Sequence, residues 1–187
     1  MASDVEICSN ALRMLGARPI TNLTDQSVEA RLCNGFYAST RDDLTTQHPW
    51  NFATKGAALA QLLEVPAFGW SVQYELPSDC LSPIKVYPEC PYRIEGRRLL
   101  ANSAGVKLLY KSRIEDSSLF PPYFTTTLEY YLAAKLAYPV VRQQSLERLR
   151  YDEYLMKLQE ARVLNDHEHT PDIVEPSVLT LVRLGGG

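Results

Sequence analysis

The chain has few of the residues, and none of the short motifs, from which enzymes commonly build a site. Its 187 residues include three histidines and four cysteines, and no two cysteines are spaced as CxxC. Because no histidine pair complements the cysteines at zinc-finger spacing, we expect no metal site of that kind. Walker A, GxGxxG, HExxH and GxSxG motifs are all absent, which removes the usual signs of a nucleotide site, a zinc protease or an α/β-hydrolase. No cofactor is expected.

An excess of positive charge and long apolar runs are also lacking. The 19 lysines and arginines face 22 acids, a formal net charge of −3, which opposes tight binding to nucleic acid. No uncharged run approaches the ~20 residues that span a bilayer, and Asp4 and Glu6 lie where a secretory signal needs positive charge. The composition, 45% hydrophobic and 22% charged, is that of an ordinary globular protein. We expect a soluble chain made in the cytoplasm, with no membrane partner.

Four segments have the apolar periodicity of helices. Ser3 and Glu6 have the spacing of a capping box, which marks the start of the first helix. Cys8 and Cys33 fall on the apolar faces of the first two helices, where a free cysteine behaves as a small hydrophobic residue. The predicted helices cover approximately residues 4–16, 27–47, 122–138 and 144–164.

Strand patterns occupy the middle of the chain. The stretch KGAALAQLL fits either a short helix or a strand, and Gly56 favours extended structure. From Trp70 onwards, apolar residues recur with a period of two. The clearest signal is YRIEGRRLLANSAGVKLLYKSRI, in which turns at Glu95-Gly96 and at residues 102–105 predict three strands joined as a meander.

These patterns predict an α+β fold: a four-helix bundle with an inserted antiparallel β meander and an extended C-terminal tail. The bundle and the insertion, at about 51–114, form one predicted domain over residues 1–165. Residues 166–187, DHEHTPDIVEPSVLTLVRLGGG, hold four acids against one arginine and still contain the β-prone run VLTLVRL. Because an unpaired apolar strand invites aggregation, we expect this tail to dock on a partner. The proposed docking residues are Val178, Leu179, Leu181, Val182 and Leu184.

The stretch most typical of a site is His48-Pro49-Trp50, directly after the second helix. A catalytic histidine needs an orienting partner, but Asp42 and Asp43 are not at the i,i+4 spacing of a facing pair. Pro49 disfavours helical backbone at His48, and Trp50 suits a large apolar plug beneath the helix end. We therefore predict that these three residues form a structural stop between the helix and the β insertion.

Other candidates for chemistry are weaker. The run Asp166-His167-Glu168-His169 is rich in possible metal ligands, but adjacent residues seldom converge on one ion without support from the rest of the fold. The carboxylate pairs Glu75/Asp79 and Glu115/Asp116 could serve a glycosidase if they lay about 5–10 Å apart in a cleft. A virion-associated glycan or peptidoglycan hydrolase therefore remains the alternative function.

Several dispersed motifs, in consistent order from about Ile7 to Leu164, carry a resemblance to a known family. The longest are ICSNALRMLGARPITNLTDQSVEARLCNGFYASTRDDLTTQHPWNFATKGAAL, PAFGWSVQYELPSDCL and YRIEGRRLL. The most specific parts are Glu29-Ala30-Arg31 with Cys33, His48-Pro49-Trp50-Asn51-Phe52-Ala53, and Tyr74-x-Leu76-Pro77-x-Asp79-Cys80-Leu81. In these residues the chain resembles the tail tubular protein A family of short-tailed bacteriophages, the head-to-tail adaptor or gatekeeper protein.

The resemblance implies a structural virion protein rather than an enzyme. In that family about a dozen copies form a ring, which binds the portal protein above and a nozzle protein of the tail tubular protein B type below. Double-stranded DNA passes through the central channel of the ring without specific binding. The resemblance further implies assembly in the host cytoplasm and a final location in the virion tail. It carries over no catalytic, cofactor-binding or metal-binding residue.

Overall fold

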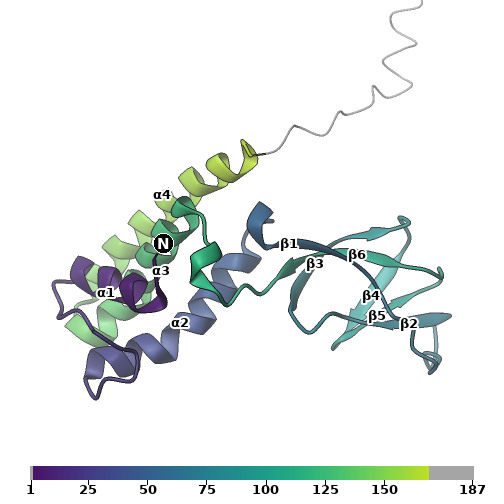
Figure 1. Ribbon diagram of the computed structural model, residues 1–187, viewed down its shortest axis with the longest axis horizontal. Coiled ribbons are helices and arrows are strands. Elements are labelled where there is room, and N and C mark those ends of the chain that lie inside the picture. The colour runs from purple at the N-terminus through teal and green to yellow at the C-terminus, as the bar shows by residue number, and fades with distance from the viewer. Residues whose placement is uncertain (1, 169–187) are drawn as a thin grey trace, which may run out of the picture.

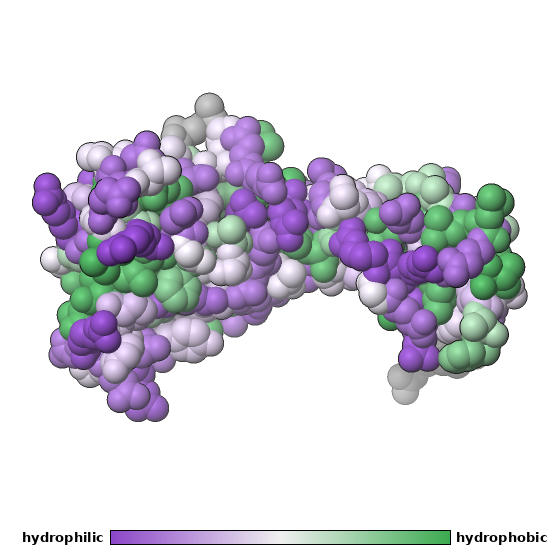
Figure 2. Space-filling view, turned by 90° about the horizontal axis from the view of Figure 1, so that it is seen from below, coloured by the Kyte–Doolittle hydropathy of each residue, from purple (hydrophilic) through white to green (hydrophobic). Residues whose placement is uncertain are grey.

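Two modules lie at opposite ends of an elongated molecule (Figure 1). The computed structural model describes residues 2–168. The helical module consists of residues 2–53 and 113–168, and the β module consists of residues 54–112, inserted between the second and third helices. A narrower waist separates the two modules in the space-filling view (Figure 2). No helix within residues 2–168 combines the length and the apolar character needed to cross a membrane.

Local capping defines the start of the first two helices. Helix α1 spans Asp4–Met14, and the Ser3 hydroxyl accepts a hydrogen bond of 3.2 Å from a backbone N–H of its first turn. Helix α2 spans Val28–Thr46, and Ser27 does the same at 3.1 Å. Such caps satisfy backbone N–H groups that the start of a helix leaves free. Both helices are slightly shorter than the predicted ranges, 4–16 and 27–47.

The other two helices are slightly longer than predicted. Helix α3 spans Pro122–Val141 and continues past Pro139, where the sequence suggested an end. Proline has no N–H to donate to the preceding turn, but α3 continues past it to Val141, and Arg142, in a left-handed conformation with φ 60°, ends the helix. Helix α4 spans Gln144–Asp166.

The prediction of a four-helix bundle is wrong, although the class α+β is correct. Helix α3 is central: α1, α2 and α4 each pack against it, while α1 and α2 contact each other little. In a four-helix bundle each helix turns one apolar stripe towards a shared core. Helix α3 is instead covered on all sides, with no exposed residue from Tyr123 to Ala137.

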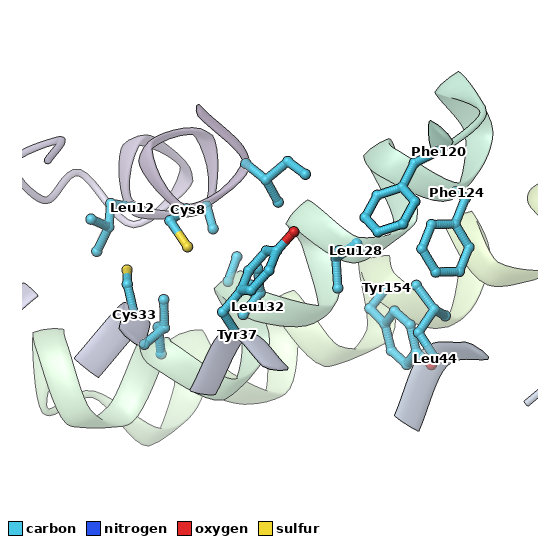
Figure 3. Close-up of a cluster of buried hydrophobic side chains, with 14 of the residues drawn as sticks. Cys8, Leu12, Cys33, Tyr37, Leu44, Phe120, Phe124, Leu128, Leu132 and Tyr154 are labelled. Carbon is cyan, nitrogen blue, oxygen red and sulfur yellow. The ribbon is translucent and has the colours of Figure 1, made fainter. Parts of the chain in front are cut away.

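Apolar side chains from all four helices form the core of the helical module (Figure 3). The thiols of Cys8 and Cys33 face each other across the contact between α1 and α2, and neither is in a disulfide. The ring of Tyr154, from α4, stacks on Tyr131 of α3 with 4.2 Å between centroids. The labelled core residues are Cys8, Leu12, Cys33, Tyr37, Leu44, Phe120, Phe124, Leu128, Leu132 and Tyr154.

Six strands form two three-stranded antiparallel sheets in the β module. The first sheet has the order β1-β6-β3, with bounds Thr54–Ala58, Lys107–Ser112 and Cys80–Tyr87. The second has the order β2-β5-β4, with bounds Val72–Glu75, Arg98–Ala101 and Tyr92–Glu95. Buried residues of both sheets share one apolar cluster, which includes Val86 and Leu108 from the first and Tyr74 and Leu99 from the second.

The predicted single meander is therefore also wrong, but only at its second turn. Strands β4 and β5 pair through the tight turn at Glu95-Gly96, where Gly96 supplies a φ of 58°. After β5 the chain crosses to the other sheet, and β6 pairs with β1 and β3. Alternation along a strand indicates which side chains are buried, but not which strand is the neighbour. The extended C-terminal tail of the prediction lies, from residue 169 on, outside the described residues.

Candidate functional site at the junction of the two modules

The His48-Pro49-Trp50 segment lies where the helical module passes into the β module. Helix α2 ends at Thr46, and Trp50 immediately precedes a short 3-10 helix, Asn51–Ala53, which leads into β1. The Trp50 side chain is fully buried, and its indole N–H donates to the Leu44 carbonyl at 2.9 Å. That carbonyl belongs to the last turn of α2 and also accepts the backbone N–H of Gln47, the C-cap residue, at 3.2 Å. The segment therefore folds back beneath the helix it follows.

Asn51 ties this segment to the far end of the chain. Its backbone N–H donates to Asn165 Oδ1 at 2.8 Å, and its side-chain Nδ2 donates to the Asn165 carbonyl oxygen at 2.8 Å. The Asn165 side chain is buried in the last turn of α4. The two asparagines thus form a reciprocal pair across 114 positions of sequence.

Sequence reasoning missed Asn165, although a signal was present. Ala161 and Asn165 follow Leu158 at helical spacing, on the side of α4 that packs into the core. A polar residue in such an apolar stripe is expected to be hydrogen-bonded, because burying an unpaired amide is unfavourable.

His48 contacts the same end of α4 through one ring nitrogen. Its Nε2 lies 3.0 Å from Asp166 Oδ1 and 3.0 Å from Asn165 Nδ2. With a proton on Nε2, the ring donates to the Asp166 carboxylate; without it, Nε2 accepts from the Asn165 amide. Burial lowers the pKa of His48 below its ordinary value, and the nearby carboxylate of Asp166 offsets only part of that effect.

Glu168, the last described residue, is also held at the junction. The Tyr123 hydroxyl donates to Glu168 Oε2 at 3.1 Å, and Asn51 Nδ2 lies 3.4 Å from the same oxygen. Burial raises the pKa of Tyr123, and its hydrogen bond to Glu168 adds to the rise. The described part of the chain therefore ends at the junction.

Further polar contacts join α2 to the strand that returns from the β module. Arg113 Nε lies 2.7 Å from Asp42 Oδ2, and Arg41 lies 2.8 Å from the other oxygen of the same carboxylate. The Ser112 hydroxyl, which is buried, donates to the Ala53 carbonyl at 2.9 Å. Both passages of the chain through the waist are thus attached to the helical module.

No protein-family model matches the chain, and no curated protein matches it. Of the predicted tail, Asp166, His167 and Glu168 are described, whereas the proposed docking residues Val178, Leu179, Leu181, Val182 and Leu184 lie outside the described residues.

The possible metal ligands near the end of α4 have other partners. Asp166 contacts His48, and Glu168 accepts from Tyr123. Within residues 2–168, no group of three or more histidine, cysteine, aspartate or glutamate side chains is arranged to hold a metal ion. His169, the fourth member of the predicted run, lies outside this range.

One member of each carboxylate pair considered for glycan hydrolysis, Asp79 and Asp116, is engaged in a structural contact. Asp79 lies 2.8 Å from Lys55 Nζ and accepts from the Tyr110 hydroxyl at 3.0 Å. Burial alone would raise the pKa of Asp79, but these two hydrogen bonds more than offset it and lower the pKa. Asp116 caps a short helix through the N–H of Ser118, and this hydrogen bonding lowers its pKa as well. A glycosidase acid needs a raised pKa, so neither aspartate has the required property.

Acidification should weaken the fold through His48. Because the pKa of His48 is lowered in the folded chain, the unfolded chain binds the proton more readily. This contribution to stability is complete above about pH 6.5, the ordinary histidine pKa, and is lost as the pH falls below it. The charged groups that act on His48 are Asp166, Arg162 and Lys111. We expect His48→Gln to reduce the fall in unfolding free energy between about pH 7 and about pH 5, measured by urea unfolding.

A matched control is His167→Gln, which changes an exposed histidine two residues beyond Asn165. That variant should keep the pH dependence of the unmodified protein. An unchanged pH dependence in His48→Gln would contradict the prediction.

Proposed function

We propose that the protein is a head-to-tail adaptor of a short-tailed bacteriophage, a virion protein that forms a ring between portal and tail nozzle. The resemblance in the three dispersed motif regions supports this role. His48-Pro49-Trp50-Asn51, within one of the three most specific parts of that resemblance, coincides with the junction described above. The alternative hydrolase finds no support in the pKa directions of Asp79 and Asp116.

The observation that carries the proposal is the separation of possible contact surfaces on a two-lobed molecule. In the β module, the loop between β1 and β2 exposes Leu63, Val65 and Phe68 within six residues. This loop lies towards the end of the β module that is farthest from the helices (Figure 1). Clustered exposed apolar side chains of this kind mark interaction sites. We assign the loop to the nozzle protein.

The remaining surfaces suit the other partners. The segment that begins after Glu168 carries the apolar run VLTLVRL and is assigned to the portal, as an added strand. The outer faces of the helical module are left for neighbouring copies in the ring. The net charge of −3 suits a channel through which DNA slides without being held.

Light scattering tests the proposal directly. The mass of the purified protein would be measured alone and after mixing with the cognate portal. We expect a ring of many copies, either alone or only on the portal, because a modest contact repeated around a ring gives high avidity. A stable monomer that ignores the portal would overturn the adaptor role.

A variant that ends at Glu168 separates portal binding from folding. The buried core described for the helical module runs from Ile7 to Ala161, so we expect this variant to unfold at the same denaturant concentration as the full chain. Its ring should fail to join the portal. Normal portal binding by the shortened chain would show that the portal site lies elsewhere.

A further inference from the structure

Helix α4 has an apolar stripe on the side that faces away from the core. Leu149, Met156 and Val163 are 52%, 60% and 54% exposed, respectively. They follow one another at intervals of seven residues, so they lie along one line of the helix. The core-facing positions of α4 are Tyr154, Leu158, Ala161 and Asn165. The stripe is therefore not needed to hold α4 against the rest of the helical module.

Helix α2 has a position without a side chain, Gly35, on its exposed face. Gly35 lies in the middle of this helix, where glycine is less favourable than alanine. A Cβ added to Gly35 would meet no atom within 4 Å, and its backbone is not left-handed. Ala38 and Ser39, on the next turn, are short and exposed as well. The fold of a single copy thus gives no reason for the glycine, whereas close approach by another helix would give one.

We propose that α4 of one copy packs parallel to α2 of a neighbouring copy, with Met156 seated over Gly35. This contact would be the lateral interface of the ring, so the inference rests on the adaptor function proposed above. The register that pairs Met156 with Gly35 also sets Leu149 opposite Val28, which is an exposed apolar residue. Both pairs can meet in one register because Leu149 precedes Met156 by seven positions, as Val28 precedes Gly35.

The same register brings opposite charges together. Asp152 comes to lie opposite Arg31, four positions before Met156 and Gly35 respectively. Both side chains are exposed, and neither has an ion-pair partner within the described residues 2–168. Complementary charge at the edge of an apolar contact favours one register over others.

Ring symmetry is consistent with a parallel contact. Copies in a ring are related by rotation about one axis, and each contact joins two different surfaces. Helices α2 and α4 both run from the outer end of the helical module towards the junction (Figure 1), where Tyr154 and Arg162 of α4 donate to Gln47, the C-cap of α2. The stripe from Leu149 to Val163 is about 21 Å long at the helical rise of 1.5 Å per residue. Helix α2, with 19 residues, is long enough to receive it.

Cysteine cross-linking in the full chain tests the contact. The double variant Gly35→Cys/Met156→Cys would be assembled as the unmodified protein is, with portal present if the ring requires it, and treated with a mild oxidant. We expect a ladder of disulfide-linked species larger than dimers, because each copy joins one neighbour through α4 and another through α2. Each single variant should give no such ladder. The four native cysteines, three of them buried, are present in every sample and set the background.

A second pair of variants measures assembly without cross-linking. Gly35→Leu should leave a single copy at least as stable, because there is space for the side chain and leucine favours the helix, yet it should abolish the ring. Leu63→Asp, a change at another exposed position, in the β module, should leave the ring intact.

The outcomes distinguish this inference from the adaptor role. A ring whose introduced cysteines do not link, or that tolerates Gly35→Leu, would overturn the proposed contact and leave the adaptor role standing. Dimers from Met156→Cys alone would show two α4 stripes facing each other, which also overturns it. A protein that stays monomeric with and without the portal would overturn both.

Discussion

Trp50→Ala should lower the free energy of unfolding by about 3–5 kcal/mol, the usual range for removing a large aromatic side chain from a core. Trp50 is fully buried and packs against Tyr123 and Phe124 of α3, with ring centroids 6.0 and 5.4 Å away. Its indole N–H also closes the end of α2 through the Leu44 carbonyl. Alanine would leave a cavity where α2, α3 and the start of the β module meet, and the Leu44 carbonyl would lose one of its two donors.

Guanidinium unfolding followed by circular dichroism would measure this loss. The chain offers a matched control in its second tryptophan, Trp70, which is only half-buried in the loop before β2. Trp70→Ala should reduce stability clearly less. Equal losses in the two variants would mean that Trp50 has no special role in joining the modules.

Asn165→Ala should destabilise the protein by about 1–3 kcal/mol, because it leaves buried polar groups without partners. The backbone N–H of Asn51 would lose its acceptor, and the Nε2 of His48 would lose one of its two neighbours. The loss should be concentrated at the end of α4. Hydrogen exchange would therefore increase most in residues 162–168 and around Asn51, ahead of any change in the β module.

Asn102→Ala is the corresponding control. Asn102 Oδ1 also accepts a backbone N–H across a loop, that of Ser71 at 2.9 Å, but it is exposed to water. Its removal should reduce stability by less than about 1 kcal/mol, because water can replace the lost partner. If Asn165→Ala had no larger effect than Asn102→Ala, the reciprocal asparagine pair would not stabilise the junction.

The helices were predictable because their signals are local. Ser3 and Ser27 cap the helices that follow them, and apolar residues recur at the helical period in both. The arrangement of the helices was not predictable in the same way. Phe124, Leu128 and Leu132 suggested a single apolar face on α3, but small or polar buried residues such as Thr127 and Ala133 allow other helices to cover its remaining sides.

For the strands, too, the contacts between neighbours in sequence were predictable, whereas the pairing of distant strands was not. The hairpin at Glu95-Gly96 follows from a turn of two residues, and the sequence identified it. The pairing of β1 with β6 joins Thr54 to Lys111, which are far apart in the chain. No pattern within either strand names its partner.

The candidate site also combines residues that the local sequence predicts with partners that it does not. Pro49 and Trp50 carry local signals for a break after α2, and these were read from the sequence. Their partners at Asn165, Asp166 and Glu168 come from more than a hundred residues later. Only Asn165, a polar residue on the core-facing side of α4, indicated a buried hydrogen bond. Its position did not identify the partner residue.

The reciprocal bonds between Asn51 and Asn165 determine where a mechanical pull would act. Any tension applied along the segment after Glu168 enters the folded chain at the last turn of α4. From there it passes through the two 2.8 Å hydrogen bonds to Asn51, which stands between α2 and β1. A force applied through Glu168 would thus act on the helical module and the β module together, at the junction between them.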